Sequence, residues 1–242
     1  MEVSRKEEFW NALTHFIGLL GSIIGISYLI YTNNNLPILN LSGVLFFGFG
    51  LTSVYLSSTL YHYVSEPILK EKLRIFDHIS IYYLIAGSYA PICLITLLDK
   101  SGLYIFIAVC IIALFGTIFK LFYTGKFEKL SLGLYLLMGW LIIVDIKTLF
   151  ENLEFNAIIL LALSGLSYTL GTIFYSMEQK YAHTIWHLFV IAGSTFHFFL
   201  VLFYIQANER GQSFVQQYMY RIQIHCVMTT NFFRQIQIYS YL

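Results

Sequence analysis

Long apolar runs separated by short polar breaks dominate the first 205 residues. Seven stretches contain the roughly 20 mainly apolar residues that a helix needs to cross about 30 Å of hydrocarbon. They fall near residues 11–31, 38–63, 75–98, 102–123, 130–150, 155–176 and 182–205. The breaks between them, such as Asn33 to Pro37, are short enough to make consecutive helices antiparallel. The pattern predicts an all-α bundle of seven transmembrane helices, with residues 1–205 forming one membrane domain.

The remaining residues, 206–242, are a different kind of sequence. They contain seven glutamines and scattered aromatic residues but no uninterrupted apolar run. We therefore expect a polar, poorly ordered tail and no eighth span.

Composition supports a membrane protein and excludes two other classes. The chain is 58% apolar and only 11% charged, whereas soluble domains average about 25% charged residues. A net charge of +1, dispersed between apolar runs, gives no basic face for nucleic acid. Three cysteines at unrelated spacings predict neither a disulfide framework nor a thiolate zinc site. The expected partners are membrane lipids and not nucleic acid, and the oligomeric state stays open.

The distribution of Lys and Arg predicts how the bundle is oriented. Segments at one side of the predicted membrane carry nine of these residues and those at the other side carry two, Lys100 and Lys147. The nine are Arg5, Lys6, Lys70, Lys72, Arg74, Lys120, Lys126, Lys129 and Lys180. Because basic residues accumulate in short cytoplasmic loops, the N-terminus is predicted inside and the end of the seventh span outside.

Four ionisable residues occur near span ends at the predicted cytoplasmic face, namely His62, Asp77, His183 and His187. Ionisable residues within spans are costly and are by default functional candidates. His183 and His187 are four residues apart, which places them on one helix face. A catalytic zinc ion takes three protein ligands and keeps one position for water. The three histidines would supply that set, and we expect their ring nitrogens within about 5 Å of a common point.

Two further residues have predicted catalytic roles beside these ligands. Asp77 would orient a water molecule or a ligand imidazole from outside the coordination shell. Ser58, four residues before His62, would steady a substrate carbonyl or the oxyanion that develops from it. The alternative for any single histidine is a packing role, with a hydrogen bond to the next helix.

A second polar set lies at the same level and could brace the site. Glu8, Asn11 and His15 share one helix face before the first span, although an ordinary interfacial helix start would look similar. His78 follows Asp77 but points about 100° away on an ideal helix. All four are candidates for residues that support the metal ligands.

Several short blocks combine these residues with their neighbours. They are Glu8–His15, Ser57–His62, Phe76–His78, Ala86–Pro91 and His183–His187. In this order and at these span ends, they resemble the signature blocks of the hemolysin III proteins, which are bacterial members of the progestin and adipoQ receptor superfamily.

The resemblance implies a bundle with its N-terminus inside and zinc held by His62, His183 and His187 near the cytoplasmic face of a bacterial plasma membrane. It also implies that Asp77 reaches the metal through water. Adiponectin receptors and alkaline ceramidases, which are similar, suggest hydrolysis of a lipid amide. The hemolysin name implies a channel-forming or cytolytic protein instead.

Three hypotheses for the function follow. The first is a zinc-dependent hydrolase acting on a lipid amide bond, and the second is a channel or cytolysin. A channel should show polar residues through the full membrane thickness, but Leu, Ile, Phe and Gly dominate the outer halves of these spans. The third hypothesis is a ligand-sensing receptor in which zinc is structural.

Overall fold

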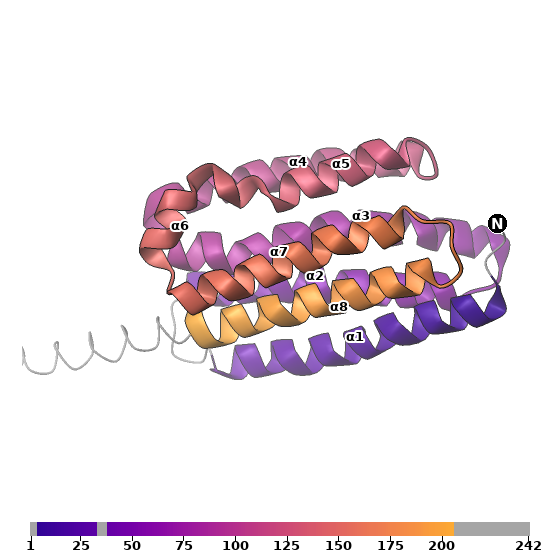
Figure 1. Ribbon diagram of the computed structural model, residues 1–242, viewed down its shortest axis with the longest axis horizontal. Helices are drawn as coiled ribbons and strands as arrows, with labels where there is room; N and C mark the ends of the chain where they lie inside the picture. Colours follow the sequence, from indigo (N-terminus) through magenta and orange to yellow (C-terminus); the bar gives the residue numbers. More distant parts are fainter. Residues whose placement is uncertain (1–3, 33–37, 206–242) are drawn as a thin grey trace, which may run out of the picture.

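A computed structural model describes residues 4–32 and 38–205, and the predicted tail lies outside these residues. Figure 1 shows the helices running side by side along one long axis. Among the described residues, seven helical segments are long and apolar enough to cross a membrane. The all-α, seven-span prediction is therefore confirmed.

The seven spans contain eight α-helices with short irregular helical segments at 92–96, 98–102, 141–145 and 201–205. The α-helices are α1 (Arg5–Thr32), α2 (Ile38–Tyr63), α3 (Pro67–Pro91), α4 (Leu103–Tyr123), α5 (Glu128–Gly139), α6 (Ile146–Asn152), α7 (Phe155–Tyr175) and α8 (Ala182–Leu200). The α2–α3, α4–α5 and α7–α8 turns all lie at the end of the bundle where α1 begins, which we call the α1 end (Figure 1).

The third span begins earlier than its hydropathy indicated. The charged residues 70–74 suggested a loop before a helix at residue 75, but α3 starts at Pro67. Glu66 caps this helix by accepting hydrogen bonds from the backbone N–H groups of Ile68 and Leu69. Proline at the first helical position needs no N–H partner. The charged residues thus form the first turns of a helix, which places Lys70 beside the N-terminal part of α1.

The fifth span is broken, whereas the sequence pattern predicted one helix over 130–150. Helix α5 ends at Gly139, a tighter turn covers Leu141–Asp145, and α6 follows from Ile146. The Asp145 carboxylate accepts a hydrogen bond from the Thr148 backbone N–H and so caps α6. Hydropathy alone does not distinguish such a break from a continuous helix.

Close backbone packing joins α2 to α3, the two helices that carry His62 and Asp77. A Cβ atom at Gly50 would lie 2.5 Å from the carbonyl oxygen of Tyr83. The hydroxyl of Ser57 also donates to that of Ser80 across this interface, at 2.9 Å. Small residues allow helices in a membrane to approach closely, and here they fix the relative height of the two helices.

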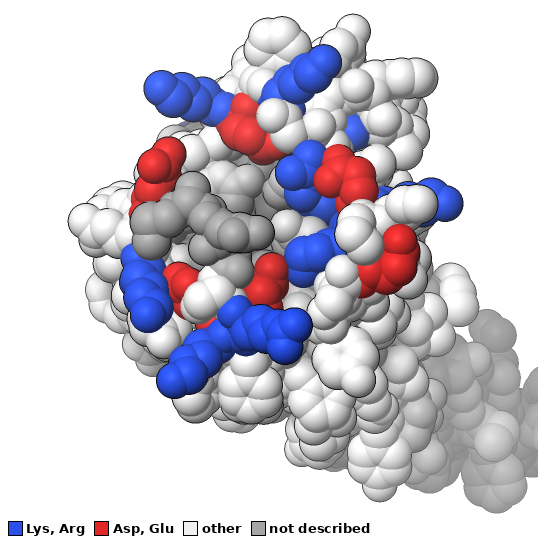
Figure 2. Space-filling view, turned by 90° about the vertical axis from the view of Figure 1, so that its right-hand side faces the viewer, with Lys and Arg blue, Asp and Glu red and all other residues white. Residues whose placement is uncertain are grey.

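The outer surface divides into an apolar belt and a charged end. Large side chains such as Ile24, Ile111 and Leu114 are more than 60% exposed along the helices, and a lipid environment makes such exposure favourable. Figure 2 shows Lys, Arg, Asp and Glu side chains arranged around the α1 end. The molecule is an integral multi-pass membrane protein.

Candidate metal centre

Three histidines from two distant parts of the chain meet at the α1 end. One ring nitrogen from each of His62, His183 and His187 lies within 4.8 Å of the other two. His62 lies in the last turn of α2, and the other two lie in the first turns of α8. The convergence predicted from the sequence is therefore present. Within residues 4–32 and 38–205, this is the one such group of three potential ligands.

The contact between His62 and Glu8 involves Nδ1 and leaves Nε2 available for a metal. Its Nδ1 lies 2.6 Å from Oε2 of Glu8 on α1. With the proton on Nδ1 donated to this carboxylate, Nε2 keeps its lone pair. That Nε2 is buried and has no hydrogen-bond partner among the described residues. A buried, unpaired ring nitrogen beside two other imidazoles fits a metal ligand.

His187 is held in the same way by α1. Its Nδ1 lies 3.1 Å from the backbone oxygen of Asn11 and 3.1 Å from the hydroxyl of Thr14. Donation from Nδ1 to the carbonyl again leaves Nε2 as the free lone pair. The side chain of Asn11 also accepts a hydrogen bond from Thr184, which lies between the two histidines of α8. Helix α1 contributes no ligand to the group, but it orients two of the three.

His15 makes a different contact from the one expected of a hydrogen-bonded brace. Its ring stacks on that of His187, with centroids 3.5 Å apart and planes 17° apart. The ring of Tyr55 lies nearly perpendicular to that of His15, with centroids 5.2 Å apart. Both ring nitrogens of His15 are buried without a partner among the described residues. Its visible contribution is to pack against a ligand ring.

The two predicted catalytic residues line the same cavity as the α8 histidines. Asp77 on α3 is 8% exposed, and Ser58 on α2 is 1% exposed. The Ser58 hydroxyl lies near the Asp77 carboxyl, yet it makes no hydrogen bond of ordinary geometry. A buried hydroxyl without a partner is uncommon. Here it is free to bind a molecule that enters the cavity.

His78 shares the cavity wall but has different neighbours. Charged groups that interact electrostatically with its ring include Lys120 on α4 and Glu128 on α5. Tyr135 donates a hydrogen bond to its backbone oxygen. This agrees with the 100° separation from Asp77 expected on a helix. The sequence pattern indicated His78 as a candidate but missed the Lys120–Glu128 pair. These two residues are eight apart and lie on either side of the α4–α5 turn.

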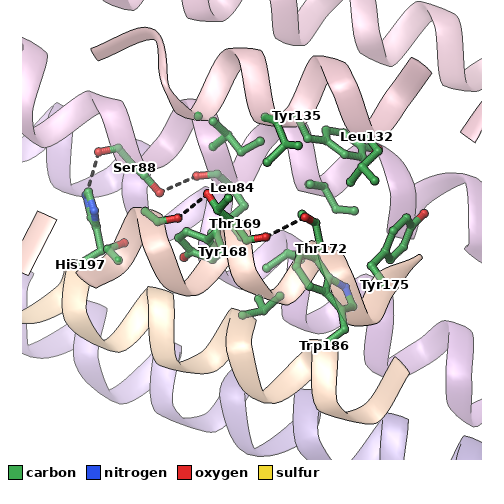
Figure 3. A pocket seen from close by; sticks show the side chains of 18 of the residues that line it. Leu84, Ser88, Leu132, Tyr135, Tyr168, Thr169, Thr172, Tyr175, Trp186 and His197 are labelled. Carbon is green, nitrogen blue, oxygen red and sulfur yellow. Dashed lines mark hydrogen bonds between the residues drawn. The ribbon is translucent and has the colours of Figure 1, made fainter. Parts of the chain in front are cut away.

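A cavity inside the bundle is lined by two of the three histidines, His183 and His187. The centres of water-sized molecules can occupy about 130 Å³ of it, and Ile92 and His197 also line it. Figure 3 shows side chains of α5, α7 and α8 around this space, among them Leu132, Tyr175 and Trp186. Most of the wall is apolar. The cavity is suited to a long apolar group whose polar end lies near the histidines.

Comparison with known proteins identifies the family. The family model described as "Haemolysin-III related" matches residues 3–198. The chain belongs to the haemolysin III family. It is 42% identical over 201 residues to "Hemolysin-3 homolog" of Bacillus subtilis, covering 82% of this chain and 94% of that protein. It is 41% identical over 202 residues to "Hemolysin-3" of Bacillus cereus, covering 83% and 92%.

A human relative supports the wider superfamily. The "Monocyte to macrophage differentiation factor" of Homo sapiens is 30% identical over 168 residues, covering 66% of this chain and 68% of the human protein. The resemblance to hemolysin III proteins and to the progestin and adipoQ receptor superfamily is thereby confirmed. The matched region contains every residue of the three-histidine group.

Proposed function

We propose that this haemolysin III protein is a zinc-dependent hydrolase of lipid amides. The observation that carries the proposal is the three-histidine group, whose ring nitrogens lie within 4.8 Å of one another and two of whose members, His183 and His187, line an apolar cavity. Asp77 is not part of this set of three ligands. Three protein ligands leave a coordination position for water, as in catalytic zinc sites, whereas structural zinc sites are usually closed by four. This favours the hydrolase over a receptor with structural zinc.

The residues around the group have the roles that amide hydrolysis needs. Zinc bound by the three imidazoles would acidify a water molecule and polarise the substrate carbonyl. The Asp77 carboxylate accepts a hydrogen bond from the attacking water and takes up its proton. The Ser58 hydroxyl donates to the carbonyl oxygen as that oxygen gains negative charge. The water oxygen bonds to the carbonyl carbon, the C–N bond breaks, and the nitrogen leaves as an amine after receiving from Asp77 the proton that was taken from water.

The substrate class follows from the shape and the lining of the cavity. An acyl chain placed along the apolar wall has its amide near Asp77 and Ser58, while the polar remainder lies at the α1 end. The basic loops at that end support a cytoplasmic position for the site. A bacterial plasma membrane is the location that we propose, because this chain matches 94% of the Bacillus subtilis relative and 92% of the Bacillus cereus relative.

A pore through the whole bundle has less support than a cavity that does not cross it. The Bacillus cereus relative carries the name "Hemolysin-3". In this chain, however, apolar side chains fill the bundle interior at the end opposite the α1 end. Leu97, Leu200 and Val201 are 0% exposed there, and Ile205 is 2% exposed. A conducting path needs polar groups through the full thickness.

Metal analysis followed by an activity assay tests the proposal. Purified protein should contain about one zinc per chain and should release fatty acid from N-acyl amides, with loss of turnover after chelation and recovery with Zn²⁺. Ceramides of several acyl lengths serve as the substrate panel. His225→Ala is the matched control, because it removes a histidine outside residues 3–198. Stoichiometric zinc without turnover of any amide would contradict the hydrolase, and absence of zinc would contradict the site.

A further inference from the structure

A second buried polar cluster lies between α3, α4 and α5, and its member His78 also lines the cavity. The Lys120 side chain is 0% exposed, and its Nζ lies 2.7 Å from Oε2 of Glu128, whose side chain is 36% exposed. The other Glu128 oxygen accepts a hydrogen bond from the Gly125 backbone N–H. The carboxylate therefore reaches from the surface of the α1 end to an ammonium group buried inside the protein.

Three polar atoms around this ion pair have no hydrogen-bond partner among the described residues. They are Nδ1 of His78 and the hydroxyl oxygens of Tyr82 and Ser131. Tyr82 and Ser131 are 0% exposed. Tyr82 is also fixed in position, because its ring occupies the space that a Cβ atom at Gly116 would need. Its hydroxyl lies near Ser131 but makes no hydrogen bond of ordinary geometry with it.

Unsatisfied polar atoms inside a membrane protein need another partner. Each such atom is costly in a hydrocarbon environment, and ordered water is the usual partner of buried polar groups that lack one in the protein. A bound water requires two to four polar contacts, and three such atoms next to a buried ion pair are candidates to supply them. The cluster is polar enough to hold water.

The cluster also joins the surface to the cavity. Glu128 is partly exposed, Lys120 lies beneath it, and His78 lines the cavity beside Asp77. Tyr135 lines the same cavity, and its ring lies 4.5 Å from that of Tyr82. Polar groups thus continue from the surface of the α1 end to the wall of the chamber.

We propose that Glu128, Lys120, His78, Tyr82 and Ser131 form a water-binding passage from the surface of the α1 end into the cavity. The passage meets the cavity at His78 on α3, whereas His183 and His187 line the cavity from α8. A lipid seated in the cavity with its polar end at these two histidines would block their side, so water would have to arrive by another route. The delivery of water for hydrolysis rests on the proposed function, whereas the presence of bound water in the passage is independent of it.

Radiolytic hydroxyl labelling of the native protein tests for the water. Millisecond X-ray exposure generates hydroxyl radicals from bound water, and mass spectrometry measures oxidation of each side chain. Metal-free protein in lipid nanodiscs is used, so that the outcome is independent of zinc and of hydrolysis. We expect Tyr82 to be oxidised at least tenfold faster than Phe47, an aromatic residue that is also 0% exposed. Equal rates for the two residues would overturn the proposal.

Substitutions then test whether the ion pair holds the water. The double substitution Lys120→Met and Glu128→Leu should reduce Tyr82 labelling to near the Phe47 rate. Lys147→Met with Glu151→Leu is the matched control, because it removes an exposed lysine–glutamate pair on α6 and should leave Tyr82 labelling unchanged. If the first double variant does not fold, Ser131→Leu fills the same space with an apolar side chain. Undiminished Tyr82 labelling in a folded variant would refute the passage.

Discussion

The carboxylate of Glu8 lies 2.6 Å from Nδ1 of His62, although 54 residues separate them in the chain. The same carboxylate meets Nζ of Lys70 at 3.0 Å. Lys70 also donates hydrogen bonds to the backbone oxygens of Tyr61 and Val64 at the end of α2. Lys70 therefore fixes the position of the Glu8 carboxylate, which in turn orients the imidazole of His62. Through this contact, α1 determines which nitrogen His62 offers to a metal.

Replacing Glu8 should weaken metal binding without removing a ligand. We expect Glu8→Ala to lower zinc affinity by about 10–100-fold, the usual effect of losing a group that orients a histidine ligand. Glu8→Gln should lower the zinc affinity less, because its amide oxygen can still accept a hydrogen bond from the Nδ1–H group of His62. Competition titration with a chromogenic chelator measures both affinities.

The control for this prediction is Glu71→Gln. Glu71 pairs with Arg74 on the exposed face of α3, at 2.7 Å, and has no contact with the histidines among those described. Its substitution should leave zinc affinity unchanged. Wild-type affinity in Glu8→Ala would show that the contact with His62 does not orient the ligand.

The two neighbouring serines of α2 should respond in opposite ways to truncation. Ser58 is buried without a hydrogen-bond partner, so Ser58→Ala should leave stability unchanged or slightly higher. If it donates to the developing oxyanion, turnover should fall by about 10²–10³-fold. Ser57 donates to Ser80 at 2.9 Å, so Ser57→Ala should cost about 1 kcal/mol of stability with little change in turnover. Thermal unfolding and amide turnover, measured on both variants, separate the two roles.

Much of the site could be predicted because helix geometry is regular. The four-residue spacing of His183 and His187 fixes their common face. The antiparallel order of the spans then brings His62 to the same end. Both facts follow from periodicity and from the count of spans, which hydropathy reports directly.

The remaining features depend on tertiary contacts that no local pattern encodes. That Glu8 would contact Nδ1 of His62 depends on the packing of α1 against α2. The charged start of α3 resembled a loop, because hydropathy does not register the cap that Glu66 provides. Lys120 seemed to be a residue near the membrane surface, but its partner Glu128 allows it to be fully buried.

Two glycine substitutions test the close packing of α2 against α3. Gly50→Ala would place a Cβ atom 2.5 Å from the Tyr83 carbonyl oxygen, which is a backbone atom that cannot rotate away. We expect a loss of about 1–3 kcal/mol, typical of overpacking. Gly21→Ala is the control, because its Cβ would meet nothing within 4 Å, and alanine favours a helix by about 1 kcal/mol over glycine. Similar thermal midpoints for the two variants would contradict the packing described.

The last prediction separates a ligand from a residue that positions water. His187→Ala should abolish stoichiometric zinc, because it removes one of the three ring nitrogens that lie within 4.8 Å of one another. Asp77→Asn should retain much of the zinc while losing turnover, because asparagine keeps the shape of the side chain but cannot take a proton from water. Zinc content and amide turnover are measured on detergent-purified variants that retain a cooperative thermal transition, so that misfolding is not read as ligand loss. Full zinc in His187→Ala, or complete loss of zinc in Asp77→Asn, would show that these two roles are wrongly assigned.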